Sequence, residues 1–240
     1  MVVESTICML VALASLQSEK DAIRNMMGLQ DPRFNQRGSF TIARITQQYW
    51  HDISVYMIDT TSGDTKLTIP RPPEYRPWFA AVDKHGRVYK LFGFDSTDFG
   101  ELPWPDSAFD CFDSVIMRGQ AFVEYLLLYD YCGIYFIKSV DDFVDLNRSR
   151  TKDTFDLEIN RAGDWNTQET LYRSLLEKCN FSRVIYDMRE RQFYVDYYVW
   201  LDRSGDLIHL NVAISKSGKC TLVAQERLAS DLGFHKAHPY

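Results

Sequence analysis

The stretch Phe193–Leu201 reads FYVDYYVWL, and the run after it, Asp206–Ser215, reads DLIHLNVAIS. Both alternate along a β-rich segment, which is the period-two pattern of a strand. The side chains that share one face of the first run are Phe193, Val195, Tyr197, Val199 and Leu201. In the second run the shared face holds Ile208, Leu210, Val212 and Ile214. Short Gly-containing turns at residues 202–205 and 217–218 connect these runs to each other and to Cys220–Ala224. The sequence therefore predicts a three-stranded antiparallel meander.

The N-terminal half carries a looser version of the same plan. Strand-like runs and turns suggest strands at residues 39–50, 53–59, 66–69, 78–82 and 87–94. A helix is predicted before each set of strands, at Ser18–Met27 and at Thr167–Cys179, the second with Asn166 or Thr167 as its N-cap. Between the sets we expect helices at Gly119–Tyr131 and Asp141–Asn147.

These elements define an α+β protein: antiparallel β-meanders with helices packed on one face. A helix followed by a curved antiparallel sheet resembles the cystatin-like and nuclear-transport-factor-like folds, although no motif supports naming either family. The polar segment from Asn147 to Trp165 is the expected boundary. We therefore divide the chain into three parts: residues 1–16, an α+β region at residues 17–150, and a helix plus meander at residues 151–240. The last two parts are either separate domains or one continuous domain. Whether the two halves are a duplication stays open.

Met1–Leu16 (MVVESTICMLVALASL) supports two interpretations. Ala12-Leu13-Ala14 has the small-x-small form that a signal peptidase cuts after, which favours export to a periplasmic or secreted location. The alternative is a cytoplasmic protein with an amphipathic N-terminal helix from about Glu4 to Met27, in which Glu19 is among the solvent-facing residues. The run lacks a basic n-region, yet we lean slightly to export. It is too short to span a membrane, which takes about twenty apolar residues.

The expected state of the cysteines depends on whether the protein is exported. After cleavage four cysteines remain: Cys111, Cys132, Cys179 and Cys220. In an oxidising compartment they allow three disulfide pairings, and in a reducing one they are expected to be buried thiols. No C-x-x-C spacing suggests a metal site.

Composition excludes one class of partner and leaves others open. The 240 residues are 45% hydrophobic and 14% aromatic, with a net charge of -6 and no basic stripe. Nucleic-acid binders draw most of their affinity from such basic residues, so no nucleic-acid partner is expected. The sequence contains no nucleophile elbow, H-E-x-x-H motif, phosphate loop or EF-hand loop, and no cofactor is expected.

An acidic run supplies the best catalytic candidates. If residues 106–117 are helical, Asp106, Asp110 and Asp113 fall on one face at i, i+4 and i+7. Such carboxylates could bind Ca²⁺ or Mg²⁺, or act as a general acid and base in hydrolysis. The competing interpretation is a solvated face with acids near a helix N-terminus.

Histidines give weaker signals. His235 and His238 form an H-x-x-H pair near the C-terminus, the only ligand-like spacing for a metal, and no third ligand accompanies them. His209 is expected on a half-exposed sheet face beside Leu207 and Asn211.

Aromatic residues give the favoured binding candidates. Tyr194, Tyr198 and Trp200 share the strand face opposite Val195 and Val199. Unless a helix covers this face, they form an apolar patch suited to a protein or carbohydrate partner. The sequence thus favours a binding or interaction module without evident catalytic motif, and the alternative is a hydrolase that uses the Asp cluster.

Overall fold

The structure is a computed structural model that describes residues 16–26, 41–45, 53–59, 78–91, 96–127, 134–153, 165–177, 179–181, 183–201, 204–230 and 232. The chain separates into two compact units, the first ending at Pro103 and the second beginning at Trp104. This division falls within the region 17–150, away from the polar segment that begins at Asn147.

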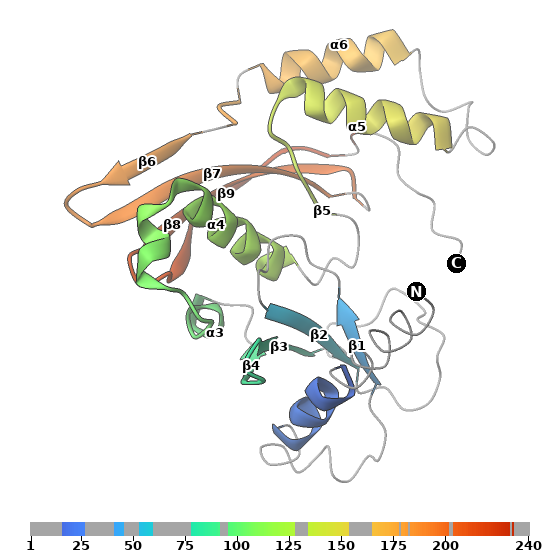
Figure 1. The fold of residues 1–240 in the computed structure, drawn as a ribbon. Helices are drawn as coiled ribbons and strands as arrows, with labels where there is room; N and C mark the ends of the chain where they lie inside the picture. The colour runs from blue at the N-terminus through green and yellow to red at the C-terminus, as the bar shows by residue number, and fades with distance from the viewer. Residues whose placement is uncertain are drawn as a thin grey trace, which may run out of the picture. The chain divides into compact units, whose positions relative to one another are not determined.

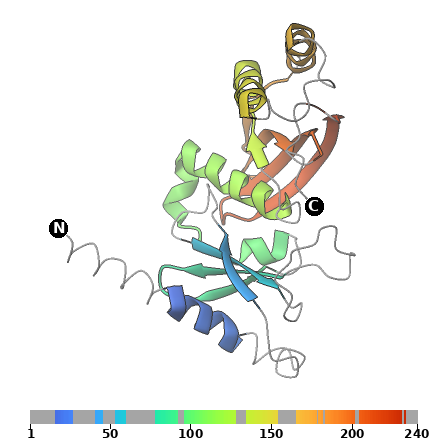
Figure 2. The same cartoon turned by 90° about the vertical axis from the view of Figure 1, so that its right-hand side faces the viewer.

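The first unit contains a four-stranded antiparallel sheet in the order β1-β2-β3-β4. Its strands are β1 (Thr41–Ile45), β2 (Ile53–Asp59), β3 (Trp78–Asp83) and β4 (Val88–Leu91). A helix at residues 16–26 lies on one face of this sheet, where Ile23 packs with Tyr56, Ile58 and Val82 (Figure 2). The hydroxyl of Tyr56 donates a hydrogen bond to the Glu19 carboxylate, so Glu19 is not the solvent-facing residue expected of an N-terminal helix. A short helix, α3 (Ser96–Gly100), contributes the buried Phe99.

The second unit contains a five-stranded antiparallel sheet (Figure 1). Its strands are β5 (Ile134–Phe136), β6 (Val184–Asp187), β7 (Gln192–Leu201), β8 (Asp206–Ser215) and β9 (Cys220–Ala229). The order is β5-β7-β8-β9, and β6 also pairs with β7. Since β5 pairs with residues 199–201 and β6 with residues 192–195, the two short strands share one edge of β7.

Helices cover both faces of this second sheet. A 3-10 helix, η2 (Asp106–Asp110), precedes α4 (Phe112–Leu127), and α4 packs on the face that carries Tyr197 and Ile214. The opposite face is covered at one end by α5 (Val140–Asp153) and α6 (Trp165–Leu176), as Figure 1 shows. The hairpin formed by β6 and the start of β7 extends beyond these two helices.

The expected fold class is confirmed: antiparallel sheets combine with several helices. The turn before β8 and the turn before β9 hold Gly205 and Gly218 at φ of 63° and 75°, a backbone conformation that glycine adopts without a Cβ penalty. Helix α4 starts earlier than the predicted helix at Gly119–Tyr131, and α5 extends beyond Asn147. Strands β5 and β6 were not predicted. The expected strand at residues 66–69 and the export segment 1–15 lie outside the described residues.

Candidate binding surface

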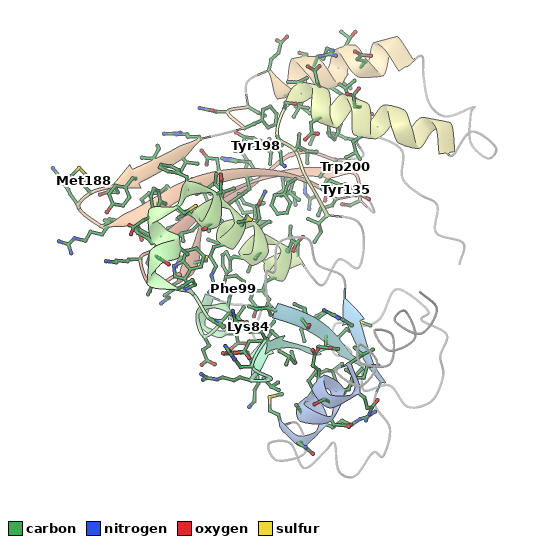
Figure 3. The ribbon with its side chains drawn as sticks, viewed as in Figure 1. Lys84, Phe99, Tyr135, Met188, Tyr198 and Trp200 are labelled. Atoms are coloured by element: carbon green, nitrogen blue, oxygen red, sulfur yellow. The ribbon has the colours of Figure 1, made fainter. Side chains whose placement is uncertain are left out.

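Two of the three predicted binding residues are core residues. Trp200 is 0% exposed and Tyr198 is 8% exposed. Both lie beneath α5 and α6, where the Trp200 ring meets Phe143 edge to face and its indole N–H donates to the carbonyl of Leu232 at 3.0 Å (Figure 3). The sequence left open whether a helix covers this face. Helices α5 and α6 do cover Tyr198 and Trp200, so the apolar patch expected of an uncovered face does not form there. We call this group, Phe143, Tyr172, Tyr198 and Trp200, the closed cluster.

Tyr194, the third predicted residue, lies beyond the helices and is half-buried. Its hydroxyl donates to the Glu190 carboxylate and accepts a hydrogen bond from the Gln192 amide. The Glu190 carboxylate raises the pKa of this hydroxyl.

The acidic candidates do not share one helix face. Helix η2 ends at Asp110, and Cys111 then adopts an extended backbone with φ of -112° and ψ of 114° before α4 begins at Phe112. This break places Asp110 and Asp113 on different elements, both exposed, and the side chain of Asp106 lies outside the described residues. Across the described part of the chain no group of three His, Cys, Asp or Glu residues could hold a metal ion.

The expected H-x-x-H pair, His235 and His238, also lies outside the described residues. His209 is instead part of a polar cluster on the sheet face that carries Tyr198. Its Nε2 lies 3.0 Å from Oδ1 of Asp196, which also accepts a hydrogen bond from the amide of Asn211 at 2.7 Å. The ring of Tyr198 stacks on the imidazole with centroids 4.7 Å apart. The predicted half exposure holds, since the His209 side chain is 24% exposed.

A different aromatic group is open to solvent. Phe193, at the start of β7, lies against three rings from neighbouring elements: 4.9 Å from Phe109 of η2, 5.3 Å from Phe112 of α4 and 4.8 Å from Tyr186 of β6. Phe109 and Phe193 are buried, whereas Phe112 is 57% and Tyr186 is 43% exposed. We call Phe109, Phe112, Tyr186 and Phe193 the open cluster. Pairing of Tyr186 with Phe193 across β6 and β7 places the two rings on one face.

The β6–β7 turn extends this surface. Met188, labelled at the tip of the hairpin in Figure 3, is 82% exposed. The Asp187 carboxylate accepts hydrogen bonds from the backbone N–H groups of Arg189 and Glu190, which stabilises the turn. Arg191 completes it with a φ of 53°, in the left-handed region.

Charged residues of both signs adjoin the open cluster along the chain. Asp110 and Asp113 are neighbours of Phe112 in the sequence, and Met188 is followed by Arg189, Glu190 and Arg191; all five charged residues are exposed. Within the described residues none of these five forms a salt bridge.

The described cysteines are free thiols. Cys111 is exposed, and the hydroxyl of Ser114 lowers its pKa by hydrogen bonding to the sulfur. Cys220 is fully buried, and burial raises the pKa of its thiol to about 12. Cys179 is half-buried, and burial raises its pKa also. Cys132 lies outside the described residues, so the expected disulfides remain without support.

Sequence reasoning missed the open cluster because it missed β6. Val184-Ile185-Tyr186 is β-rich and ends at Asp187, a turn residue, which is a usable strand signal. Phe109 and Phe112 were visible as apolar positions, but nothing local showed that they meet Phe193.

Comparisons with known proteins identify no relative: no family model matches the chain, and neither a curated protein nor a solved structure matches it. Among the described residues no helix combines the length and apolar character needed to cross a membrane.

Proposed function

We propose that this protein is a non-catalytic binding or interaction module and that the open cluster is its contact surface. The supporting observation is the exposure of Phe112, Tyr186 and Met188 beside a packed ring pair. Aromatic residues and methionine are enriched in the cores of protein interfaces, and buried anchors of this kind supply most of the binding free energy. A protein partner fits these residues best, and a carbohydrate is the other outcome that the test must separate.

The test compares two surfaces of the same chain. The double variant Phe112→Ser with Tyr186→Ser removes the exposed rings of the open cluster. The matched control, Leu171→Ser with Val223→Ser, removes exposed apolar side chains elsewhere, at 58% and 53% exposure. We expect protein pull-downs or glycan arrays to lose a specific ligand only with the first variant. Equal ligand retention by both variants would contradict the proposal.

Hydrolysis is the second candidate function. The pair Asp196 and His209 supports it more directly than the predicted Asp cluster does. Asp196 orients His209 as a carboxylate orients the imidazole in acyl-transfer triads. If Nε2–H donates to Asp196, Nδ1 is left as the proton acceptor. His209→Gln should then abolish turnover in a screen of ester and glycoside substrates. If the predicted Asp cluster is the site instead, Asp110→Ala should abolish turnover or remove the stabilisation that a divalent cation gives.

Export remains part of the proposal, and its test is independent of the surface. Intact mass of the protein from its native host, with and without reductant, would show a mature N-terminus near Ser15 if the segment is cleaved. Addition of two hydrogens per bridge on reduction would reveal disulfides. A full-length chain with free thiols would contradict export.

A further inference from the structure

Three polar side chains lie together on the face of the second sheet that carries Tyr198, next to the closed cluster. Asp196 of β7 lies directly opposite Asn211 of β8, and His209 is two residues away from Asn211 on the same strand. Side chains two residues apart on a strand point to the same face of the sheet. The three side chains therefore occupy neighbouring positions on one face, two on β8 and one on β7.

The polar atoms of this group converge on one carboxylate oxygen. Oδ1 of Asp196 lies 3.0 Å from Nε2 of His209 and 2.7 Å from the side-chain amide nitrogen of Asn211. A metal ion with bonds of about 2.1 Å holds two ligands at a right angle about 3.0 Å apart. The three side chains are thus spaced as three adjacent ligands of one ion would be.

The ligand types match a divalent transition-metal ion. The Asn211 amide now donates to Asp196, and a half turn of this amide exchanges its nitrogen for its oxygen at the same point. One imidazole with two oxygens fits ions such as Mn²⁺ and Co²⁺, whereas Ca²⁺ and Mg²⁺ prefer oxygen alone. The described chain has no metal-binding set of three His, Cys, Asp or Glu residues, and this group differs because its third member is an asparagine.

Neighbouring residues hold two of the ligands in position. The ring of Tyr198 stacks on the imidazole of His209, with centroids 4.7 Å apart and planes inclined by 17°. Nε of Arg183 lies 3.9 Å from Oδ2 of Asp196, the carboxylate oxygen outside the group. The Asp196 side chain is 8% exposed and that of His209 is 24% exposed. Ligands fixed in this way form a prepared site, and the partly exposed imidazole leaves it accessible to an ion.

The charges beside the group favour a cation. Glu226 of β9 lies opposite His209, so it shares this face, and it is exposed. The carboxylates of Asp196 and Glu226 outnumber the single guanidinium of Arg183. A surface with an excess of negative charge raises the local concentration of cations.

We propose that Asp196, His209 and Asn211 bind a divalent transition-metal ion through Oδ1, Nε2 and the amide oxygen. Three protein ligands leave coordination positions for water or a substrate. The inference goes beyond the proposed contact surface, because these residues lie on the face of β7 opposite to Phe193. It also differs from the proton-transfer role of His209, in which Nε2 carries a proton, since a ligating nitrogen carries none.

Isothermal titration calorimetry of the full chain with Co²⁺ tests the proposal. The background variant Cys111→Ser, His235→Gln and His238→Gln removes the exposed thiol and the H-x-x-H pair, which could bind the ion elsewhere. We expect one Co²⁺ per background chain, with Mg²⁺ binding more weakly. Adding His209→Phe should weaken Co²⁺ binding at least about tenfold, because even the loss of an outer-shell partner costs about 10–100-fold.

Asn211→Asp distinguishes a metal site from a group held together only by hydrogen bonds. Without metal this variant places two carboxylates opposite each other on β7 and β8, so its melting temperature should fall. With Co²⁺ the third ligand becomes a carboxylate, so the affinity should rise and the ion should restore the lost stability. A lower melting temperature that Co²⁺ does not restore would overturn the proposal.

Two other results overturn it: a background chain that does not bind Co²⁺, or a folded His209→Phe variant that binds as tightly as the background. If that variant does not fold, proton NMR of the background with substoichiometric Mn²⁺ replaces it. The ring protons of His209 should broaden and those of the exposed His85 should not; equal broadening would contradict the site. Phe112→Ser with Tyr186→Ser leaves these ligands intact and should bind Co²⁺ normally, so the metal site and the proposed contact surface can fail separately.

Discussion

The closed and open clusters of the second unit are built from the same kinds of residue and share strand β7. Phe193 belongs to the open cluster, whereas Tyr198 and Trp200, a few residues later, belong to the closed one. Trp200 is 0% exposed and Phe112 is 57% exposed. The two groups lie on opposite faces of β7. Helices α5 and α6 cover the face that carries Tyr198 and Trp200, whereas Phe193 lies on the face of α4, where the first residue of that helix, Phe112, stays exposed. Aromatic composition alone therefore does not distinguish a core from a contact surface.

The largest expected effect is at the closed cluster. Trp200→Ala should lower the free energy of unfolding by about 3–5 kcal/mol, because it leaves a cavity under α5 and removes the partner of the Leu232 carbonyl. Urea denaturation followed by far-UV circular dichroism measures it. A loss below about 1 kcal/mol, within the range of surface substitutions, would show that this cluster is not core.

The contact between α4 and the sheet should give the next effect. A Cβ on Gly119 would lie 2.0 Å from the Tyr197 hydroxyl and 2.9 Å from Cδ1 of Ile214. Gly119→Ala should cost about 1–3 kcal/mol from this overlap, although alanine alone favours a helix by about 1 kcal/mol.

A double-mutant cycle isolates that overlap. Tyr197→Phe removes the nearest atom, so the combined variant should be more stable than the sum of the two single losses predicts. Additive losses in urea denaturation would mean that the helix does not approach the sheet at this glycine.

A smaller effect is expected from Tyr197→Phe alone. Its hydroxyl donates to the carbonyl of Ile116 at 2.8 Å, and losing that hydrogen bond should cost about 1 kcal/mol near neutral pH. Burial raises the pKa of this hydroxyl well above its usual value of 10.0. The folded state therefore favours the neutral phenol, and stability that is present below pH 10 is lost as the pH rises beyond it.

The variant lacks this ionisation, so its deficit relative to the wild type should shrink above pH 10. Denaturation curves collected across that pH range supply the test. A deficit that grows with pH would contradict the sign derived from burial.

The smallest effect should come from the open cluster. Phe112→Ala should change the unfolding free energy of the dilute chain by no more than about 0.5 kcal/mol, as surface substitutions usually do. A loss comparable to that of Trp200→Ala would make the open cluster part of the core. The open and closed clusters would then not differ in their contribution to stability, and the proposed contact surface would be ruled out.

The regular elements were largely predictable because their signals are local. The alternation in Phe193–Leu201 and Asp206–Ser215 gave β7 and β8, and Gly205 and Gly218 marked the turns between the long strands. Strand β6 was missed because its signal lies only in composition, three β-rich residues before a turn residue, and four residues are too few for alternation to support it. The predicted Asp face failed because the helix breaks at Cys111, and no residue there announces the break.

The candidate site was less predictable than the fold. Tyr198 and Trp200 share a strand face, as alternation dictates, but their burial depends on two helices that begin at residues 140 and 165. The pairing of Asp196 with His209 follows from the register between β7 and β8, which sequence alone suggests but does not fix.

The sequence by itself determined the α+β class, the antiparallel meander and the side-chain alternation on each long strand, since these follow from backbone geometry and short-range patterns. Tertiary structure decided which aromatic residues are sealed and which are open. That outcome depends on where helices lie across a sheet, and such contacts join residues far apart in the chain. Phe112 and Phe193 meet only because α4 packs on the sheet, so their exposure is a property of the packed unit rather than of either segment.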